Sequence, residues 1–182
     1  MAETTVYQFV PDVVESAAYR VISQLLPITL AYADQNNSRL DLPYATLKVS
    51  SRLTIGRDEE GKVNVDGIMP MHGVREGVVM INVYGGSARE HCDNLVNNIR
   101  KVTSRYLMRR EKFVISNNAE VQNITGLRDN ANFESMANVD LTFRYTGKYT
   151  DDVGLIETVD ATGDIGGHET HIEIAVTSPD NQ

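Results

Sequence analysis

Residues 77–84 constrain the fold of this chain more than any other stretch, because they are apolar at almost every position. A run of this kind predicts a strand that is covered on both faces. Gly85-Gly86 ends it, and Ser87 with Glu90 three residues later predicts a capping box at the start of a helix. From residue 88 to 107 apolar side chains recur at steps of three and four, which indicates one helix with one buried stripe. A central strand and its covering helix therefore form the predicted core.

The remaining periodicities predict the other elements. Residues 13–26 form a second helical pattern that Pro27 ends, and a short helical run is expected over residues 28–33. Polarity alternates over residues 45–55 and 133–145, as in strands with one wet face. A charged hairpin loop is expected at residues 56–61, with a returning strand at 62–71, a short strand at 112–116, and strand plus loop at 117–130. The predicted class is α+β, a mainly antiparallel mixed sheet with two helices packed on it.

The composition changes near the C-terminal end. Residues 1–163 are predicted to form one α+β domain, and residues 164–182 an acidic, glycine-rich extension. Ile172, Ile174 and Val176 alternate there, so this strand can add to the sheet edge of a neighbour as an assembly arm. A loose tail is the alternative.

Charge and hydropathy limit the partners. The formal net charge is −8, which disfavours tight binding of nucleic acid. It permits a surface along which DNA passes without being bound. No run of about 18 apolar residues is present, so no membrane partner is expected.

No assembled catalytic site is apparent. The corner at Gly85-Gly86-Ser87 resembles a phosphate site only in having two glycines before a helix, and it lacks the P-loop and dinucleotide patterns. His168 and His171 are three apart, which is half a metal site only in a helix with further ligands. Cys92 lies on the apolar stripe and is expected to be a buried thiol. We therefore expect no enzyme activity, no metal and no cofactor.

The charged hairpin is the other candidate for a contact with subunits or partners. Its candidate residues are Arg57, Asp58, Glu59 and Glu60. A solvated loop is the alternative for these four.

Three segments, in this order and spacing, carry a family resemblance. They are residues 42–49 (Leu-Pro-Tyr-Ala-Thr-Leu-Lys-Val), residues 79–85 before the helix, and residues 133–145 followed by 155–159. Together they resemble the tail terminator, or neck terminator, proteins of long-tailed bacteriophages over roughly residues 10–160. Ser135-Met136-Ala137 departs from the pattern, since family members often carry an arginine there. The extension after Gly163 has no counterpart that we can place.

The resemblance implies a structural subunit of the virion tail or neck, assembled in the host cytoplasm. It implies a six-fold homo-oligomeric ring at the head-proximal end of the tail, which ends growth of the tail tube. The implied partners are the tail tube or sheath protein, a head-completion or connector protein, and viral DNA that passes through the lumen without sequence-specific binding.

Other functions remain open at this point. The chain can be a different virion ring protein, either a tail tube subunit or a head–tail connector. A metal-dependent or phosphate-binding enzyme is a rival from another class, and so is a cytoplasmic adaptor that adds its C-terminal strand to a partner.

Overall fold

The computed structural model describes residues 9–35, 38–116, 119–124, 126–128, 132–155, 158–165 and 168–175. The chain divides into two compact units. Unit 1 comprises residues 1–56 and 74–146, and unit 2 comprises residues 57–73 and 147–182. The long strands β2 (Tyr44–Glu60), β3 (Ile68–Tyr84) and β8 (Met136–Asp152) each have a segment in both units.

The first helix, α1 (Val13–Leu25), is built as the sequence predicts. Asp12 precedes it, and its carboxylate accepts a hydrogen bond of 2.8 Å from the amide of Glu15. The Glu15 carboxylate accepts in return from the amide of Asp12 at 2.9 Å. This reciprocal capping box satisfies two amides that a helix N-terminus leaves unpaired. The helix ends at Leu25, two residues before Pro27.

The single helix predicted over residues 88–107 is wrong, because the structure has two: α2 (Ala88–Ile99) and α3 (Val102–Glu111). The predicted cap at Ser87 is also wrong. Its backbone is left-handed, with φ 61°, and its side chain makes no capping hydrogen bond. The break between the helices changes the phase of the stripe, which is buried only along α2, at Ala88, Cys92, Leu95 and Ile99.

Six strands form the main sheet. The hydrogen-bonded order is β1-β2-β3-β8-β4, with β5 also paired to β8. In chain order the shorter strands are β1 (Thr29–Tyr32), β4 (Phe113–Ile115) and β5 (Val121–Asn123). Among the described pairings, β1 is parallel to β2, whereas β4 and β5 are antiparallel to β8. The α+β class and the mixed sheet are therefore confirmed, but the predicted helices over 28–33 and 88–107 need correction.

Two further hairpins lie outside this sheet. β6 (Gly126–Arg128) pairs antiparallel with β7 (Asn132–Glu134), and β9 (Thr158–Ile165) pairs antiparallel with β10 (His168–Ala175). The domain boundary expected between residues 163 and 164 falls within β9. The division into residues 1–163 and 164–182 stays a prediction.

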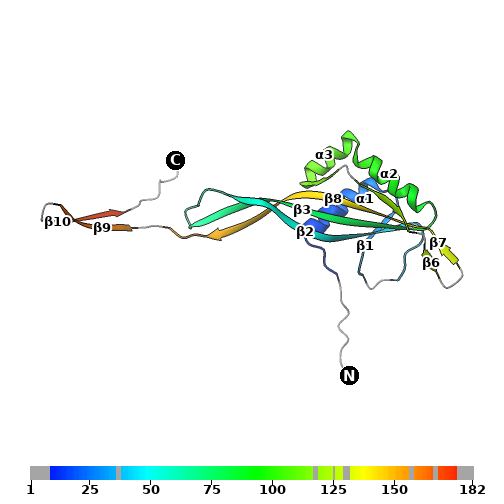
Figure 1. Ribbon diagram of the computed structural model, residues 1–182, viewed down its shortest axis with the longest axis horizontal. Helices are drawn as coiled ribbons and strands as arrows, with labels where there is room; N and C mark the ends of the chain where they lie inside the picture. The colour runs from blue at the N-terminus through cyan, green and yellow to red at the C-terminus, as the bar shows by residue number, and fades with distance from the viewer. Residues whose placement is uncertain are drawn as a thin grey trace, which may run out of the picture. The chain divides into compact units, whose positions relative to one another are not determined.

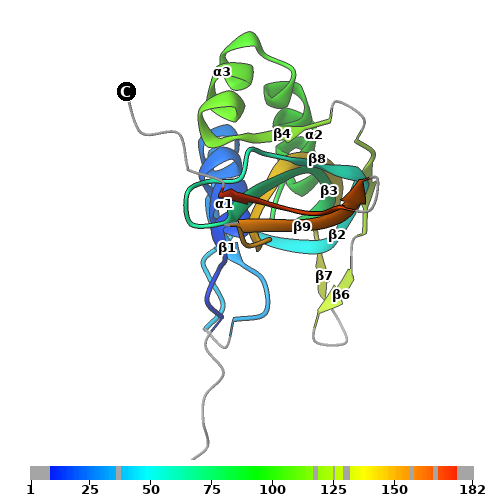
Figure 2. The same cartoon turned by 90° about the vertical axis from the view of Figure 1, so that its left-hand side faces the viewer.

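The core lies between the sheet of unit 1 and its helices, which Figures 1 and 2 show gathered on one face of the strands. Buried residues alternate along the strands, as Val79, Ile81 and Val83 do on β3. The intervening residues Val78 and Met80 are half-buried, so the prediction that both faces are covered is wrong for the isolated chain. Every buried hydrophobic residue of the described chain belongs to unit 1.

Candidate assembly surfaces

The four hairpin candidates lie on a strand and not in a loop, which corrects the prediction for residues 56–61. Arg57, Asp58, Glu59 and Glu60 form the last four residues of β2. The side chains of Arg57 and Glu60 make an ion pair of 2.6 Å between nitrogen and oxygen, and both are exposed. A pair of this exposure contributes little to stability. These charges are therefore available to a partner at low cost.

The turn of this hairpin lies further along the chain, at residues 64–67. The side-chain oxygen of Asn64 accepts hydrogen bonds from the amides of Asp66 at 3.0 Å and Ile68 at 2.8 Å. Val65, at the centre of the turn, is 68% exposed. The hairpin therefore presents an apolar tip beside its charges.

The C-terminal candidates lie in β10, which pairs with β9 of its own chain. Ile172 lies opposite Ala161, and Ile174 opposite Val159. Val176 falls outside the described residues. One edge of β10 is thus occupied by β9, and addition of the other edge to a neighbour stays a prediction.

Unit 2 has an unusual charge and no apolar core among its described residues. By sequence it holds three Lys or Arg against twelve Asp or Glu, a net charge of −9. Unit 1 holds fourteen against thirteen, a net charge of +1. The described side chains of Val63, Val153 and Leu155 in unit 2 are exposed. Small strand assemblies without a buried hydrophobic face are marginal alone, so unit 2 is suited to being completed by a partner.

A second surface of unit 1 is the sheet face away from the buried core residues, which we call the open sheet face. Tyr44 on β2 and Tyr84 on β3 stack there with ring centroids 4.8 Å apart. Arg144 on β8 donates to Glu76 on β3 at 2.7 Å. Half-buried residues of this face are Tyr44, Thr46, Val78, Met80, Asn82, Tyr84, Met136, Asn138 and Thr142.

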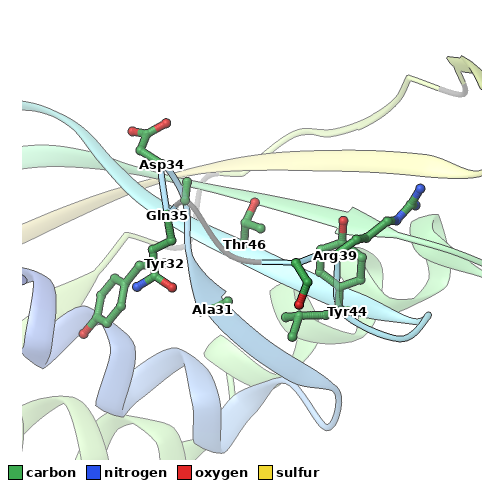
Figure 3. A pocket seen from close by; sticks show the side chains of 10 residues that line it. Ala31, Tyr32, Asp34, Gln35, Arg39, Tyr44 and Thr46 are labelled. Carbon is green, nitrogen blue, oxygen red and sulfur yellow. The ribbon is translucent and has the colours of Figure 1, made fainter. Parts of the chain in front are cut away.

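A pocket of about 170 Å³ lies beside this face and is drawn in Figure 3. Residues of β1, of β2 and of the segment between them line it, with Tyr32, Arg39 and Tyr44 the largest. The Arg39 guanidinium lies 5.9 Å from the centroid of the Tyr44 ring and forms an ion pair with Glu134. Arg39 is thus engaged within the chain, and the described residues that line the pocket form no catalytic constellation.

The chemical candidates do not assemble. His168 and His171 lie on a strand, so the helical spacing that a metal motif requires is absent. Within the described residues no three of His, Cys, Asp and Glu are grouped to hold a metal ion. Burial raises the pKa of the Cys92 thiol to about 11, with a smaller contribution from Asp93, so a thiolate is strongly disfavoured at neutral pH. Among the described helices none is long and apolar enough to cross a membrane.

Two surfaces were missed by the sequence predictions. The exposed side of α3 was assigned to a buried stripe, because the break after Ile99 has no glycine or proline to mark it. The Tyr44–Tyr84 stack joins the far ends of two consecutive strands, and only the phase of the alternating residues places both rings on one face.

Comparison with known proteins supplies a family. A family model described as phage neck terminator protein matches residues 5–169. A search of curated proteins found no match.

Proposed function

Because the chain belongs to the phage neck terminator protein family, we propose that it forms a ring at the head-proximal end of the phage tail. In this proposal the ring is a homohexamer that ends growth of the tail tube and joins the tail to the head. The tail tube or sheath protein contacts one side, and a head-completion or connector protein contacts the other. The chain acts as a structural protein, is assembled in the host cytoplasm, and has no catalytic role.

The observation that carries the proposal is the composition of unit 2. Its described residues lie mostly in the ends of β2, β3 and β8, the turn between β2 and β3, and the β9–β10 hairpin. None of its described hydrophobic side chains is buried. Unit 1, by contrast, contains the whole described core and three helices. A segment without a core of its own gains most by packing on another protein, as expected of a subunit whose function is assembly.

Two sets of residues are proposed to make these contacts. Arg57, Asp58, Glu59 and Glu60 supply charge, which is exposed at all but the half-buried Asp58. Ile172, Ile174 and Val176 supply apolar side chains for a strand added to a neighbour. The proposed C-terminal extension from residue 164 acts as the assembly arm.

The acidic balance of the chain supports passage of DNA through such a ring. A lumen of net negative charge repels phosphates, so DNA can move through without being bound. The formal net charge of −8 has the required sign.

The deciding experiment examines phage tails made in infected cells with and without this protein. Electron microscopy is expected to show tails of uniform length, each capped by a six-fold ring, only when the protein is present. Tails of uniform length in its absence would overturn the proposal. Light scattering of the purified protein adds a second readout, because open-ended polymers would identify a tube subunit instead.

The rivals from other classes have tests of their own. Bound zinc, or a rise in melting temperature with metal or nucleotide, would favour an enzyme. An adaptor would lose its partner, without unfolding, when the residues after Gly163 are deleted.

A further inference from the structure

One face of α3 is exposed and combines apolar with basic side chains. Val102, Arg105, Tyr106 and Arg109 follow one another at steps of three, one and three, which places them on one side of the helix. We call these four residues the α3 stripe. Val102 is 62% and Tyr106 65% exposed, whereas Ser104 and Met108 are the buried residues of this helix. Tyr and Arg are among the side chains that are enriched at binding hot spots.

The charges of the stripe are not neutralised by side chains that the structure describes. Neither Arg105 nor Arg109 has an acidic partner within 4.0 Å among the described residues. Glu111, the acid at the end of α3, is engaged elsewhere: it accepts from Arg20 at 2.6 Å and from Arg110 at 3.1 Å. A surface of this kind attracts a negatively charged partner.

Unit 2 of the same chain has the opposite charge by sequence, and its described exposed acids are Glu59, Glu60, Asp66, Asp151 and Asp152. Unit 2 has a net charge of −9, and its exposed apolar side chains include Val65, Val153 and Leu155. Its charge is complementary to that of the stripe, and each surface has exposed apolar groups to bury.

We propose that the α3 stripe binds the acidic unit 2 of a second copy of this chain. The contact joins two different surfaces, so each copy offers a stripe to one neighbour and unit 2 to the other. Repetition of such a heterologous contact gives a ring when the rotation closes. This inference rests on the proposed ring and names the surfaces that build it.

Duplex DNA is a weaker candidate for the stripe. A phosphate-binding surface gains affinity from many basic residues, and the stripe supplies two around an apolar centre. The complementary acidic surface, moreover, is present in every copy of the chain.

Charge reversal tests the contact. One variant carries Arg105→Glu and Arg109→Glu, and a second carries Glu59→Lys and Asp151→Lys in unit 2, where both acids are exposed. Each variant alone is expected to self-associate at least about tenfold more weakly than the wild type in sedimentation at low salt. In an equimolar mixture of the two, the unchanged stripe of the second variant meets the unchanged unit 2 of the first, so pairs that contain one copy of each variant are expected to form. Added salt should weaken wild-type association.

A matched control keeps net charge constant and changes only position. Arg105→Glu is compared with Arg89→Glu, which reverses an exposed arginine on α2. Circular dichroism melts check that all variants fold. Only Arg105→Glu is expected to weaken association.

The other outcomes overturn the inference. Unchanged association of the stripe variant, failure of the mixture to recover, or a wild type that stays monomeric at low salt would each show that the contact is not made. If the stripe variant bound duplex DNA more weakly than the wild type but self-associated as strongly, the stripe would be assigned to DNA binding. Six-fold rings on tails made with the stripe variant would reject this contact while leaving the proposed function intact, whereas wild-type tails without rings would reject both.

Discussion

The hydroxyl of Ser104 on α3 donates a hydrogen bond of 2.6 Å to the carbonyl of Asn98 near the end of α2. Ser104 is the buried polar residue of the described core, with 3% of its surface exposed. The Asn98 side chain in turn donates to the carbonyl of Leu25 at the end of α1, at 2.7 Å. This pair of residues therefore links the three helices at the point where the chain turns from α2 into α3.

We expect Ser104→Ala to lower the free energy of unfolding by about 1 kcal/mol, because the half-buried Asn98 carbonyl then keeps only backbone amides, such as that of Lys101, as donors. Urea denaturation followed by circular dichroism measures the change. Thr103→Ala, at the exposed neighbouring position, is the control and should change stability by less than about 0.5 kcal/mol. Equal stability of the two variants would show that the hydrogen bond does not hold the helices.

Gly77 on β3 is expected to be intolerant of a side chain. A Cβ atom at this position would lie 2.5 Å from the carbonyl oxygen of Ser51 and 2.6 Å from the ring of Phe143. We expect Gly77→Ala to destabilise unit 1 by about 1–3 kcal/mol through overpacking, as measured by thermal melting. Gly86→Ala is the matched control, since a Cβ there meets nothing within 4 Å, and it should leave the melting temperature nearly unchanged. A tolerated Gly77→Ala would mean that β2 and β8 can move apart.

The cap of α1 predicts how stability depends on pH. Burial opposes ionisation of Asp12, but its hydrogen bond with Arg52 and those with the amides of Glu15 and Val14 outweigh this, so the pKa lies below its ordinary value. Because the pKa of Asp12 is lower in the folded state, its ionised carboxylate stabilises the fold at pH values above its unfolded pKa near 3.8. This stabilisation is lost as the pH falls through the folded pKa.

Asp12→Asn isolates this charge, because asparagine is an equally good helix cap. We expect the variant to be less stable than the wild type at pH 7, and the difference to shrink below pH 4. Denaturation curves across this range measure it. A difference that does not depend on pH would assign the loss to the cap and not to the Arg52 pair.

Cys92 should report unfolding and not catalysis. It is fully buried, and burial raises the pKa of its thiol to about 11. At pH 7.4 we expect labelling by iodoacetamide to be negligible in the native protein and complete in urea. Rapid labelling of the native protein would show that the Cys92 thiol is accessible and reactive.

The sequence was sufficient where the hydrophobic period was unbroken. The helix after Asp12, the strand over residues 77–84 and the long alternating strand near residue 139 are all present. The helix after Asp12 and the strand near residue 139 each bury a face of regular period, whereas the strand over residues 77–84 was identified by its continuous apolar run.

The errors arose where tertiary contacts overrode local pattern. Residues 29–32 read as helix, but they pair in parallel with residues 44–47, and no local signal reveals that pairing. The charges of residues 57–60 suggested a loop, because a strand exposed on both faces has no hydrophobic alternation to identify it. The turn after Ile99 lacks a helix breaker, and the buried serine that completes it lies on the following helix.

The confinement of the described core to unit 1 has a consequence for how such a protein can diverge. Substitutions at exposed positions of unit 2 leave the described core untouched, so they are expected to cost little folding stability. If unit 2 is where the chain meets its neighbours, its recognition surface can drift with theirs while selection on the fold acts elsewhere. Each phage lineage can then change the contact residues of unit 2 to fit a different tail or head protein while the core of unit 1 stays the same.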